Sequence, residues 1–225
     1  KFSKNGAAYT AAATTIINGD VITLQATSPV AGQQDTIAVT IGSSSFNWYV
    51  RTVANNSIYT FVTSSTRNGA IGSMAAADTV CNNEASAAGL GGSWIALLAT
   101  SPSNSDGPLS RAPWNWTTLK NMNNQVIATS FDDFADGTLS NPINRTAGNA
   151  LSSATYVWTG AASATGLTSG STSSNPCSNW TSSAAGSSAY TGIINSTTSH
   201  FYNNGTLSTC NSTYPIYCIQ DPGSS

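Results

Sequence analysis

Apolar and polar positions alternate along the first part of the chain, with the period of a half-buried β-strand. The alternation is clearest at residues 21–27 and 36–41, and a short apolar segment follows at 46–50. An earlier apolar segment, residues 12–17, runs into Asn18-Gly19-Asp20, which is a turn signal. This pattern predicts three or four strands separated by turns.

The pattern changes after residue 54. Residues 58–63 predict a strand, as do residues 93–100, the most apolar run of the chain, and residues 214–220. Residues 73–88 predict a helix, because apolar positions recur on one of its faces and Gly89 can end it. That helical face consists of Met74, Ala77, Val80, Cys81 and Ala85.

Turn-forming residues dominate much of the remaining sequence. They are frequent over residues 101–155. Tracts rich in Ser, Gly and Thr at 160–176 and 182–188 lie beside tryptophan and cysteine, so we expect them to be ordered long loops. The chain is therefore predicted to hold a β unit over residues 1–54 and a mostly-β, α+β domain over residues 55–225.

Low charge excludes several kinds of partner. Charged residues make up 7% of the chain and the net charge is −2. Seven scattered Lys and Arg residues cannot neutralise a row of phosphates, so we expect no nucleic-acid partner. No apolar run approaches 18 residues, so we expect no membrane span. A neutral surface rich in hydroxyl and amide groups is typical of secreted fibres and adhesins, although it also fits a surface that simply resists non-specific contact.

The four cysteines predict two disulfides. Cys81, Cys177, Cys210 and Cys218 form no C-x-x-C motif, and a single histidine, His200, cannot complete a zinc site with them. Two disulfides indicate an oxidising, extracellular compartment. The residues themselves leave all three pairings open.

The order of elements after residue 55 resembles the C-type lectin-like fold. A strand leads to a helix that carries a cysteine, then to a W-I-x-L strand, a long irregular region, and a last strand with a cysteine. The closer resemblance is to domains of this fold on bacterial surface proteins. It is carried by FVTSSTRNG (61–69), AADTVCNNEA (76–85), DGTLSNPI (136–143), VWTG (157–160), CSNWTS (177–182) and YCIQ (217–220).

This resemblance implies the disulfides Cys81–Cys218 and Cys177–Cys210. It also implies that Trp94, Trp158 and Trp180 are core residues. Sugar-binding members of the fold hold Ca²⁺ through Glu-Pro-Asn or Gln-Pro-Asp and through Trp-Asn-Asp. This chain has none of these tripeptides, so we expect no calcium-dependent lectin site and no cofactor.

The first part of the chain resembles the C-terminal half of bacterial immunoglobulin-like modules. The resemblance is carried by NGDVITL (18–24), TIAVTIG (36–42) and FNWYVRT (46–52). A complete sandwich of this kind has about seven strands, so residues 1–53 predict a partial immunoglobulin-like β unit. We expect strands from outside to complete it. The alternative is packing on the following domain, which would bury Trp48 and Val50.

Candidate chemistry is sparse. Asp132, Asp133 and Asp136 form the single acidic cluster and are weak candidates for a metal site, but a turn with solvated carboxylates explains them better. Glu84 is the only glutamate, so a pair of carboxylates for glycoside hydrolysis is not indicated. His200 accompanies no nucleophile motif. We expect no enzyme activity.

The functional hypothesis is a non-catalytic recognition or adhesion module on a bacterial surface protein or appendage. It would bind a glycan or a protein through its long loops. Trp114, Asn115 and Trp116 lie in turn-rich sequence and are the candidate ligand contacts, because tryptophan stacks on sugars and amides bind hydroxyls. The alternative is a structural subunit of an extracellular filament that self-associates through residues 1–53.

Overall fold

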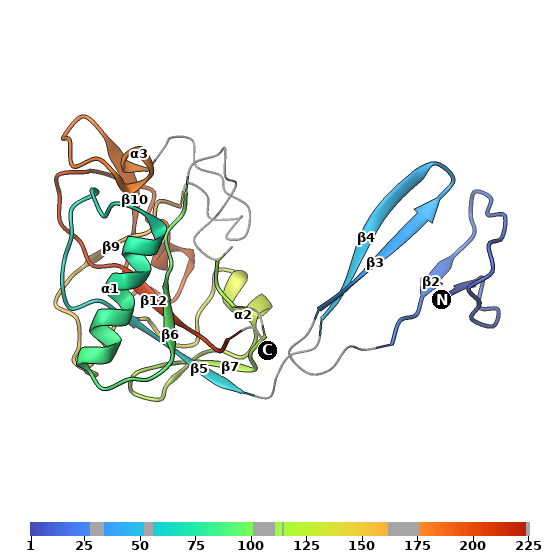
Figure 1. Ribbon diagram of the computed structural model, residues 1–225, viewed down its shortest axis with the longest axis horizontal. Coiled ribbons are helices and arrows are strands. Elements are labelled where there is room, and N and C mark those ends of the chain that lie inside the picture. The colour runs from blue at the N-terminus through green and yellow to red at the C-terminus, as the bar shows by residue number, and fades with distance from the viewer. Residues whose placement is uncertain (28–33, 52–55, 101–110, 114, 162–175, 224–225) are drawn as a thin grey trace. The chain divides into compact units, whose positions relative to one another are not determined.

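The computed structural model describes residues 1–27, 34–51, 56–100, 111–113, 115–161 and 176–223 (Figure 1). These residues belong to two compact units, residues 1–53 (unit 1) and residues 54–225 (unit 2). The sequence pattern places the boundary one residue later. Unit 2 is mostly β with few helices and contains two disulfides, as the sequence predicts.

Unit 1 contains two separate two-stranded antiparallel sheets. Strands β1 (Phe2–Lys4) and β2 (Ile22–Leu24) form one, and β3 (Gln34–Ile41) and β4 (Ser44–Arg51) form the other. Ile41 pairs with Ser44 around a two-residue turn, in which Gly42 has a φ of 62°. A positive φ at this place is the reason for a glycine.

The sequence pattern leaves the number of strands at three or four, and the apolar segment 12–17 forms none in the structure. Thr10, just before it, exchanges two backbone hydrogen bonds with Phe2 of β1. The turn after this segment is held by the carboxylate of Asp20. It accepts hydrogen bonds from the Lys4 side chain, the Ile17 backbone and the Asn5 side chain, which lower the pKa of Asp20 to about 2.

A five-stranded sheet forms the centre of unit 2, in the order β6-β12-β5-β7-β8. Its strands are β5 (Ser57–Val62), β6 (Ser93–Ala96), β7 (Thr118–Asn121), β8 (Val126–Ala128) and β12 (Tyr217–Asp221). Only β5 and β7 are parallel among these described strands. The last strand of the chain therefore lies between β5 and β6, which come early in unit 2.

A second, three-stranded sheet has the order β11-β10-β9. It contains β9 (Tyr156–Trp158), β10 (Ser188–Ile193) and β11 (Leu207–Thr209). A bridge between Trp158 and Ile216 joins β9 to the segment that enters β12. The two sheets thus meet just before the last strand.

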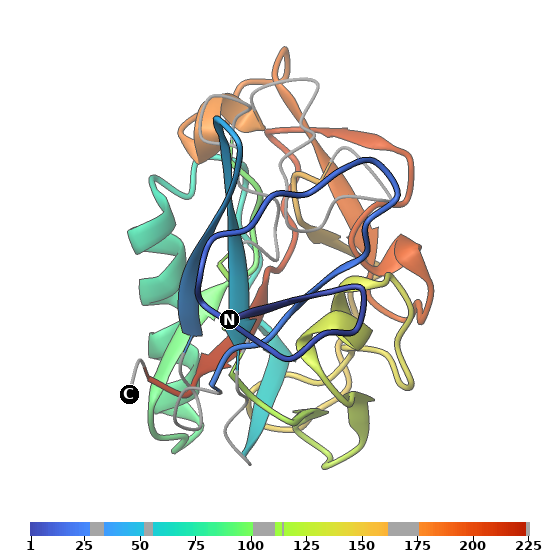
Figure 2. The same ribbon diagram turned by 90° about the vertical axis from the view of Figure 1, so that its right-hand side faces the viewer.

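The main helix, α1 (Met74–Ala87), lies along β6 (Figures 1 and 2). It begins where the Ser73 hydroxyl accepts a hydrogen bond from the Ala76 amide, and it ends before Gly89, which has a φ of 73°. The helix is within one residue of its predicted limits. Three shorter helices follow: α2 (Phe131–Ala135), α3 (Cys177–Trp180) and η1 (Ser199–Phe201).

Alternation along β12 divides the hydrophobic core of unit 2 into two layers, because successive side chains of a strand point to opposite faces. Tyr217 and Ile219 pack with residues of β5, β7 and α2. Cys218 faces the other way and packs with α1, where the disulfide Cys81–Cys218 joins strand and helix. Cys177–Cys210 is the second disulfide. This is the pairing that the resemblance implies.

Helix α3 is a single left-handed turn. Its four residues, Cys177 to Trp180, all have φ between 44° and 65°. Such a conformation costs roughly 1–2 kcal/mol per residue outside glycine. Buried anchors hold it: Cys177 is in the second disulfide, and the Trp180 indole donates a hydrogen bond of 2.8 Å to the Ala99 carbonyl.

Two further features differ from the sequence expectation. The strand predicted at residues 93–100 ends at Ala96, although the residues that follow are buried. Residues 118–135, expected to form turns, contain β7, β8 and α2. Part of the predicted long loop, residues 162–175, lies outside the described residues.

Gly192 is the glycine whose replacement should test this core. A Cβ atom there would lie 2.0 Å from the Phe201 carbonyl oxygen and 2.6 Å from its carbon, which are backbone atoms of η1. We expect Gly192→Ala to destabilise the protein by more than about 2 kcal/mol, lowering the melting temperature by about 5 °C or more. Calorimetry measures this.

The matched control is Gly186→Ala. No atom lies within 4 Å of a Cβ at Gly186, and its φ is not positive. This variant should unfold within about 2 °C of the unmodified protein. Equal melting temperatures for both variants would contradict the packing of η1 on β10.

Candidate functional site

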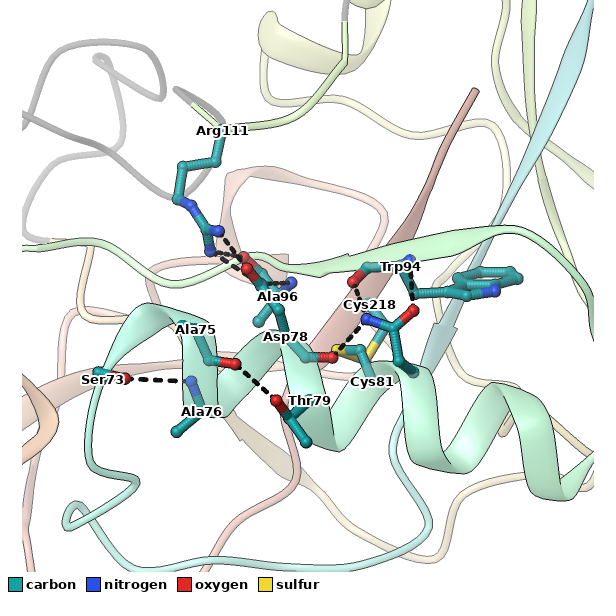
Figure 3. A network of polar contacts seen from close by, with 11 residues as sticks. Ser73, Ala75, Ala76, Asp78, Thr79, Cys81, Trp94, Ala96, Arg111 and Cys218 are labelled. Atoms are coloured by element: carbon teal, nitrogen blue, oxygen red, sulfur yellow. Dashed lines mark hydrogen bonds and ion pairs between the residues drawn. A yellow bond between two sulfur atoms is a disulfide. The ribbon is translucent and has the colours of Figure 1, made fainter. Parts of the chain in front are cut away.

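The polar side chains of α1 are used to fix the helix to its surroundings (Figure 3). The Asp78 carboxylate accepts a hydrogen bond of 2.9 Å from the Ala96 amide and receives both terminal nitrogens of Arg111, at 3.0 and 2.5 Å. The Arg111 side chain also donates to the Ala96 carbonyl. The pair is about three-quarters buried. It holds Arg111 and the end of β6 to the helix, which is a structural role.

Asn82 and Glu84 of α1 also hold neighbouring segments to the helix. The Asn82 amide donates to the Trp94 carbonyl at 2.8 Å and accepts from the Trp94 amide at 3.0 Å. The Glu84 carboxylate accepts four hydrogen bonds, from the backbone amides and hydroxyls of Ser64 and Ser65. All four hydrogen bonds that the Glu84 carboxylate accepts come from the loop after β5, so Glu84 anchors that loop to α1.

The acidic cluster spans the helix α2 and the turn at Asp136-Gly137 that follows it, and Asp132 and Asp136 are exposed, as the sequence predicts. Asp133 lies in the first turn of α2 and accepts hydrogen bonds from the Thr129 amide and hydroxyl at 2.6 and 2.9 Å. Asp136 accepts from the Thr138 amide and hydroxyl, both at 2.7 Å. Asp132 shares that first turn, where an acidic residue suits the helix dipole. The carboxylates of Asp133 and Asp136 thus accept hydrogen bonds from residues of their own segment.

No group of three or more His, Cys, Asp or Glu side chains is placed to hold a metal ion within the described parts of the chain. Hydrogen bonding within its own segment is therefore the role that the geometry gives to the acidic cluster.

The candidate tryptophan site is not formed as the sequence suggests. Trp114 lies outside the described residues. Asn115 is half-buried and already has an interaction partner. Trp116 is fully buried: its indole donates to the Pro113 carbonyl and its ring packs edge-on against Phe134, with centroids 6.4 Å apart. A ring inside the core offers no face to a ligand, so the ligand role expected for Trp116 is corrected here.

The expected core role of three other tryptophans is confirmed. Trp94, Trp158 and Trp180 are all buried. Trp158 is the centre of an aromatic cluster, because its ring lies edge-on to both Trp180 at 5.8 Å and Tyr214 at 4.9 Å. This cluster leads from the core to the surface.

At the surface end of this cluster lies a group of residues that sequence analysis did not select. Tyr156 is 40% exposed, and its ring stands edge-on to Tyr214 at 6.0 Å. Tyr214 is half-buried, and its hydroxyl lies 3.4 Å from the Ser208 hydroxyl. Two tyrosine rings are thus held at fixed angles at an exposed edge of unit 2.

Arg67 adds a positive charge to this surface. Arg67 and Tyr214 form an antiparallel bridge and exchange two backbone hydrogen bonds, of 2.8 and 3.0 Å. The side chains of such a directly opposed pair project on the same face of the ladder. Arg67 is exposed, and no described acidic residue forms an ion pair with it. We call Arg67, Tyr156 and Tyr214 the tyrosine–arginine surface.

Buried phenols in the core are a different case. Burial raises the pKa of the Tyr217 phenol well above its usual range. Burial, with the nearby charge of Asp136, also raises the pKa of Tyr202. Both phenols are therefore neutral at physiological pH. His200 lies on the exposed side of η1, where its Nδ1 atom is 3.0 Å from the Thr198 hydroxyl.

Comparison with known proteins assigns no family to the chain. It matches no protein-family model and no curated protein. Within the described residues, no helix is long and apolar enough to cross a membrane. Function must therefore be argued from the site geometry.

The hydrogen bonding of the acidic cluster predicts that metal removal leaves the fold unchanged. Asp133 and Asp136 already receive their hydrogen bonds from protein donors, so their segments do not need a cation. We expect EDTA, or added Ca²⁺, to change the melting temperature by less than about 2 °C, which corresponds to less than about 1 kcal/mol for a domain of this size. A decrease of more than about 10 °C in EDTA would instead require a structural metal ion.

Proposed function

We propose that this chain is an extracellular, non-catalytic recognition module of a bacterial surface protein, and that unit 2 binds a glycan through the tyrosine–arginine surface. The observation that carries the proposal is the ring contact between the exposed Tyr156 and the half-buried Tyr214, whose backbone pairs with Arg67, an exposed arginine that has no acidic partner among the described residues. A protein ligand is the alternative within the same function.

The C-type lectin-like fold is part of the proposal. In its support, a cysteine on α1 is bonded to the last strand, an inner disulfide ties the preceding loop region, and β12 lies centrally in the sheet. Two disulfides also support an oxidising compartment outside the cytoplasm. For unit 1, the two-stranded antiparallel sheets are compatible with part of an immunoglobulin-like sandwich.

Physical chemistry suits the tyrosine–arginine surface to sugars. A tyrosine ring offers an apolar face to the C–H groups of a sugar ring, and its hydroxyl can exchange hydrogen bonds with sugar hydroxyls. The Tyr156–Tyr214 contact fixes the ring angle, so binding orders few side-chain torsions. The guanidinium of Arg67 supplies several N–H donors and can bind a carboxylate with two of them. A glycan with acidic groups fits this combination best.

Binding of this kind needs no bound cation, because the contacts are ring stacking and direct hydrogen bonds. This differs from sugar binding through Ca²⁺, for which the characteristic tripeptides are missing from the sequence. Only 7% of the residues are charged, so few other charges offset the positive charge of Arg67.

A glycan array probed with the full chain tests the proposal. We expect binding to a subset of acidic glycans, unaffected by EDTA. Tyr156→Ala should weaken binding about 2- to 13-fold, since an aromatic contact contributes roughly 0.5–1.5 kcal/mol beyond area burial. Arg67→Gln should weaken binding to acidic glycans more than to neutral ones. The Arg67 side chain makes no described hydrogen bond, so the fold should tolerate this change.

Tyr49→Ala is the matched control, because Tyr49 is an equally large aromatic residue, 52% exposed, in unit 1. It should leave glycan binding unchanged. If folded protein bound no glycan on the array and did not adhere to cells, the recognition function would be rejected. If Tyr156→Ala and Tyr49→Ala bound equally well, the site assignment would be rejected.

A further inference from the structure

The β3–β4 hairpin of unit 1 has one apolar and one polar face. Because side chains alternate and the register pairs Ile37 with Trp48 and Val39 with Phe46, the apolar residues of both strands share one face. This face, called the apolar face, holds six apolar residues, Ile37, Val39, Ile41, Phe46, Trp48 and Val50, together with Asp35 opposite Val50 at its open end and Ser44 opposite Ile41 at the turn. The other face consists of Thr36, Ala38, Thr40, Ser45, Asn47 and Tyr49.

Unit 1 does not bury this face. No apolar side chain among its described residues is buried; Ile41 is 44% and Phe46 is 51% exposed. Unit 1 also contributes seven of the ten large hydrophobic side chains that are exposed in the described residues. An isolated two-stranded hairpin is at best marginally stable in water. The hairpin therefore needs a covering partner.

The β1–β2 sheet does not fill this role. An open groove of about 170 Å³ separates the two sheets of unit 1 and is lined by apolar side chains of both, among them Phe2, Leu24, Val39 and Ile41. Ile22 and Leu24 of β2 stay half-exposed beside it. The two apolar surfaces face a shared space without filling it.

The edges of the hairpin are open as well. β3 and β4 pair only with each other among the described strands, so their outer N–H and C=O groups can accept another strand. Natural edge strands are usually protected from such pairing by charged residues or proline. The hairpin contains no proline, and its two charged residues, Asp35 and Arg51, lie at its open end. Residues 36–50, between them, contain no charge that opposes the approach of an identical hairpin.

We propose that unit 1 associates with unit 1 of a second copy of this chain through the apolar face of β3–β4. An identical partner satisfies each observation: unit 1 does not bury its own apolar face, and the same patch can serve on both subunits, as a two-fold interface requires. An antiparallel arrangement of the two hairpins keeps the two Asp35 residues at opposite ends, which avoids the repulsion that opposed like charges would cause.

The size of the apolar face predicts a reversible dimer. A fully buried aromatic side chain removes about 150–250 Å² from water, and the six side chains on each copy are already partly covered. The interface is thus on the order of 1,000 Å² in total, at the lower limit for specific association. We expect a concentration-dependent dimer with a dissociation constant in roughly the micromolar range.

Sedimentation velocity on the full chain from about 1 to 200 μM tests this proposal. We expect the mean sedimentation coefficient to rise with concentration. Phe46→Thr should weaken dimerisation at least 10-fold, whereas Tyr49→Thr should leave it unchanged. Phe46 and Tyr49 are both on β4 and are 51% and 52% exposed, but they lie on opposite faces of the hairpin. Threonine suits a strand, so both variants should keep the hairpin.

Hydrogen–deuterium exchange at low and high protein concentration provides a second measurement. Amides of residues 36–50 should gain protection as concentration rises, and those of unit 2 should not. A chain that stayed monomeric up to 200 μM would overturn the proposal and would favour a different covering partner. Equal weakening by Phe46→Thr and Tyr49→Thr would assign the interface to another face. Neither result decides whether unit 2 binds a glycan, which the Tyr156→Ala and Arg67→Gln variants test.

Discussion

Unit 2 depends on the insertion of its last strand between two early ones. β12 pairs with β5 on one side and β6 on the other, and Cys218 on that strand is bonded to Cys81 of α1. The bond spans a sequence separation of 137 residues, which removes roughly 4–5 kcal/mol of unfolded-state entropy on the loop-closure estimate. Because the intervening chain contains mainly short elements, this closure positions them and their surface side chains.

Regular patterns made part of this fold predictable. The 3.6-residue period placed α1, two-residue alternation placed β3, and a short apolar segment after a turn placed β4. β7 and β8 could not be found this way, since strands of four and three residues are too short for a period and owe their conformation to pairing with neighbours. Trp116 lies in turn-rich sequence but is buried, because α2 brings Phe134 against it. No local signal reports that contact.

The candidate site was unpredictable for a related reason. Arg67, Tyr156 and Tyr214 come from three distant parts of the sequence, and the bridge between Arg67 and Tyr214 joins two of them. The sequence pattern points to aromatic residues in turns and predicts a strand at 214–220, which assigns no surface role to Tyr214. A useful signal was present just before VWTG: Tyr156 lies two residues before the core residue Trp158, on the same face of β9, and extends the core aromatics outward.

The two units differ in how they bury their apolar side chains, and this difference connects glycan binding by unit 2 with dimerisation through unit 1. Unit 2 closes its core within itself, so its surface aromatics are available for a ligand, whereas unit 1 leaves its apolar face for another copy. A contact by one or two tyrosines gives weak affinity for a single glycan. Association through unit 1 would place two such surfaces in one particle, and the second binding event then occurs at a high effective concentration. Weak self-association and weak recognition can therefore produce firm attachment to a repetitive glycan surface, while a single chain still dissociates readily.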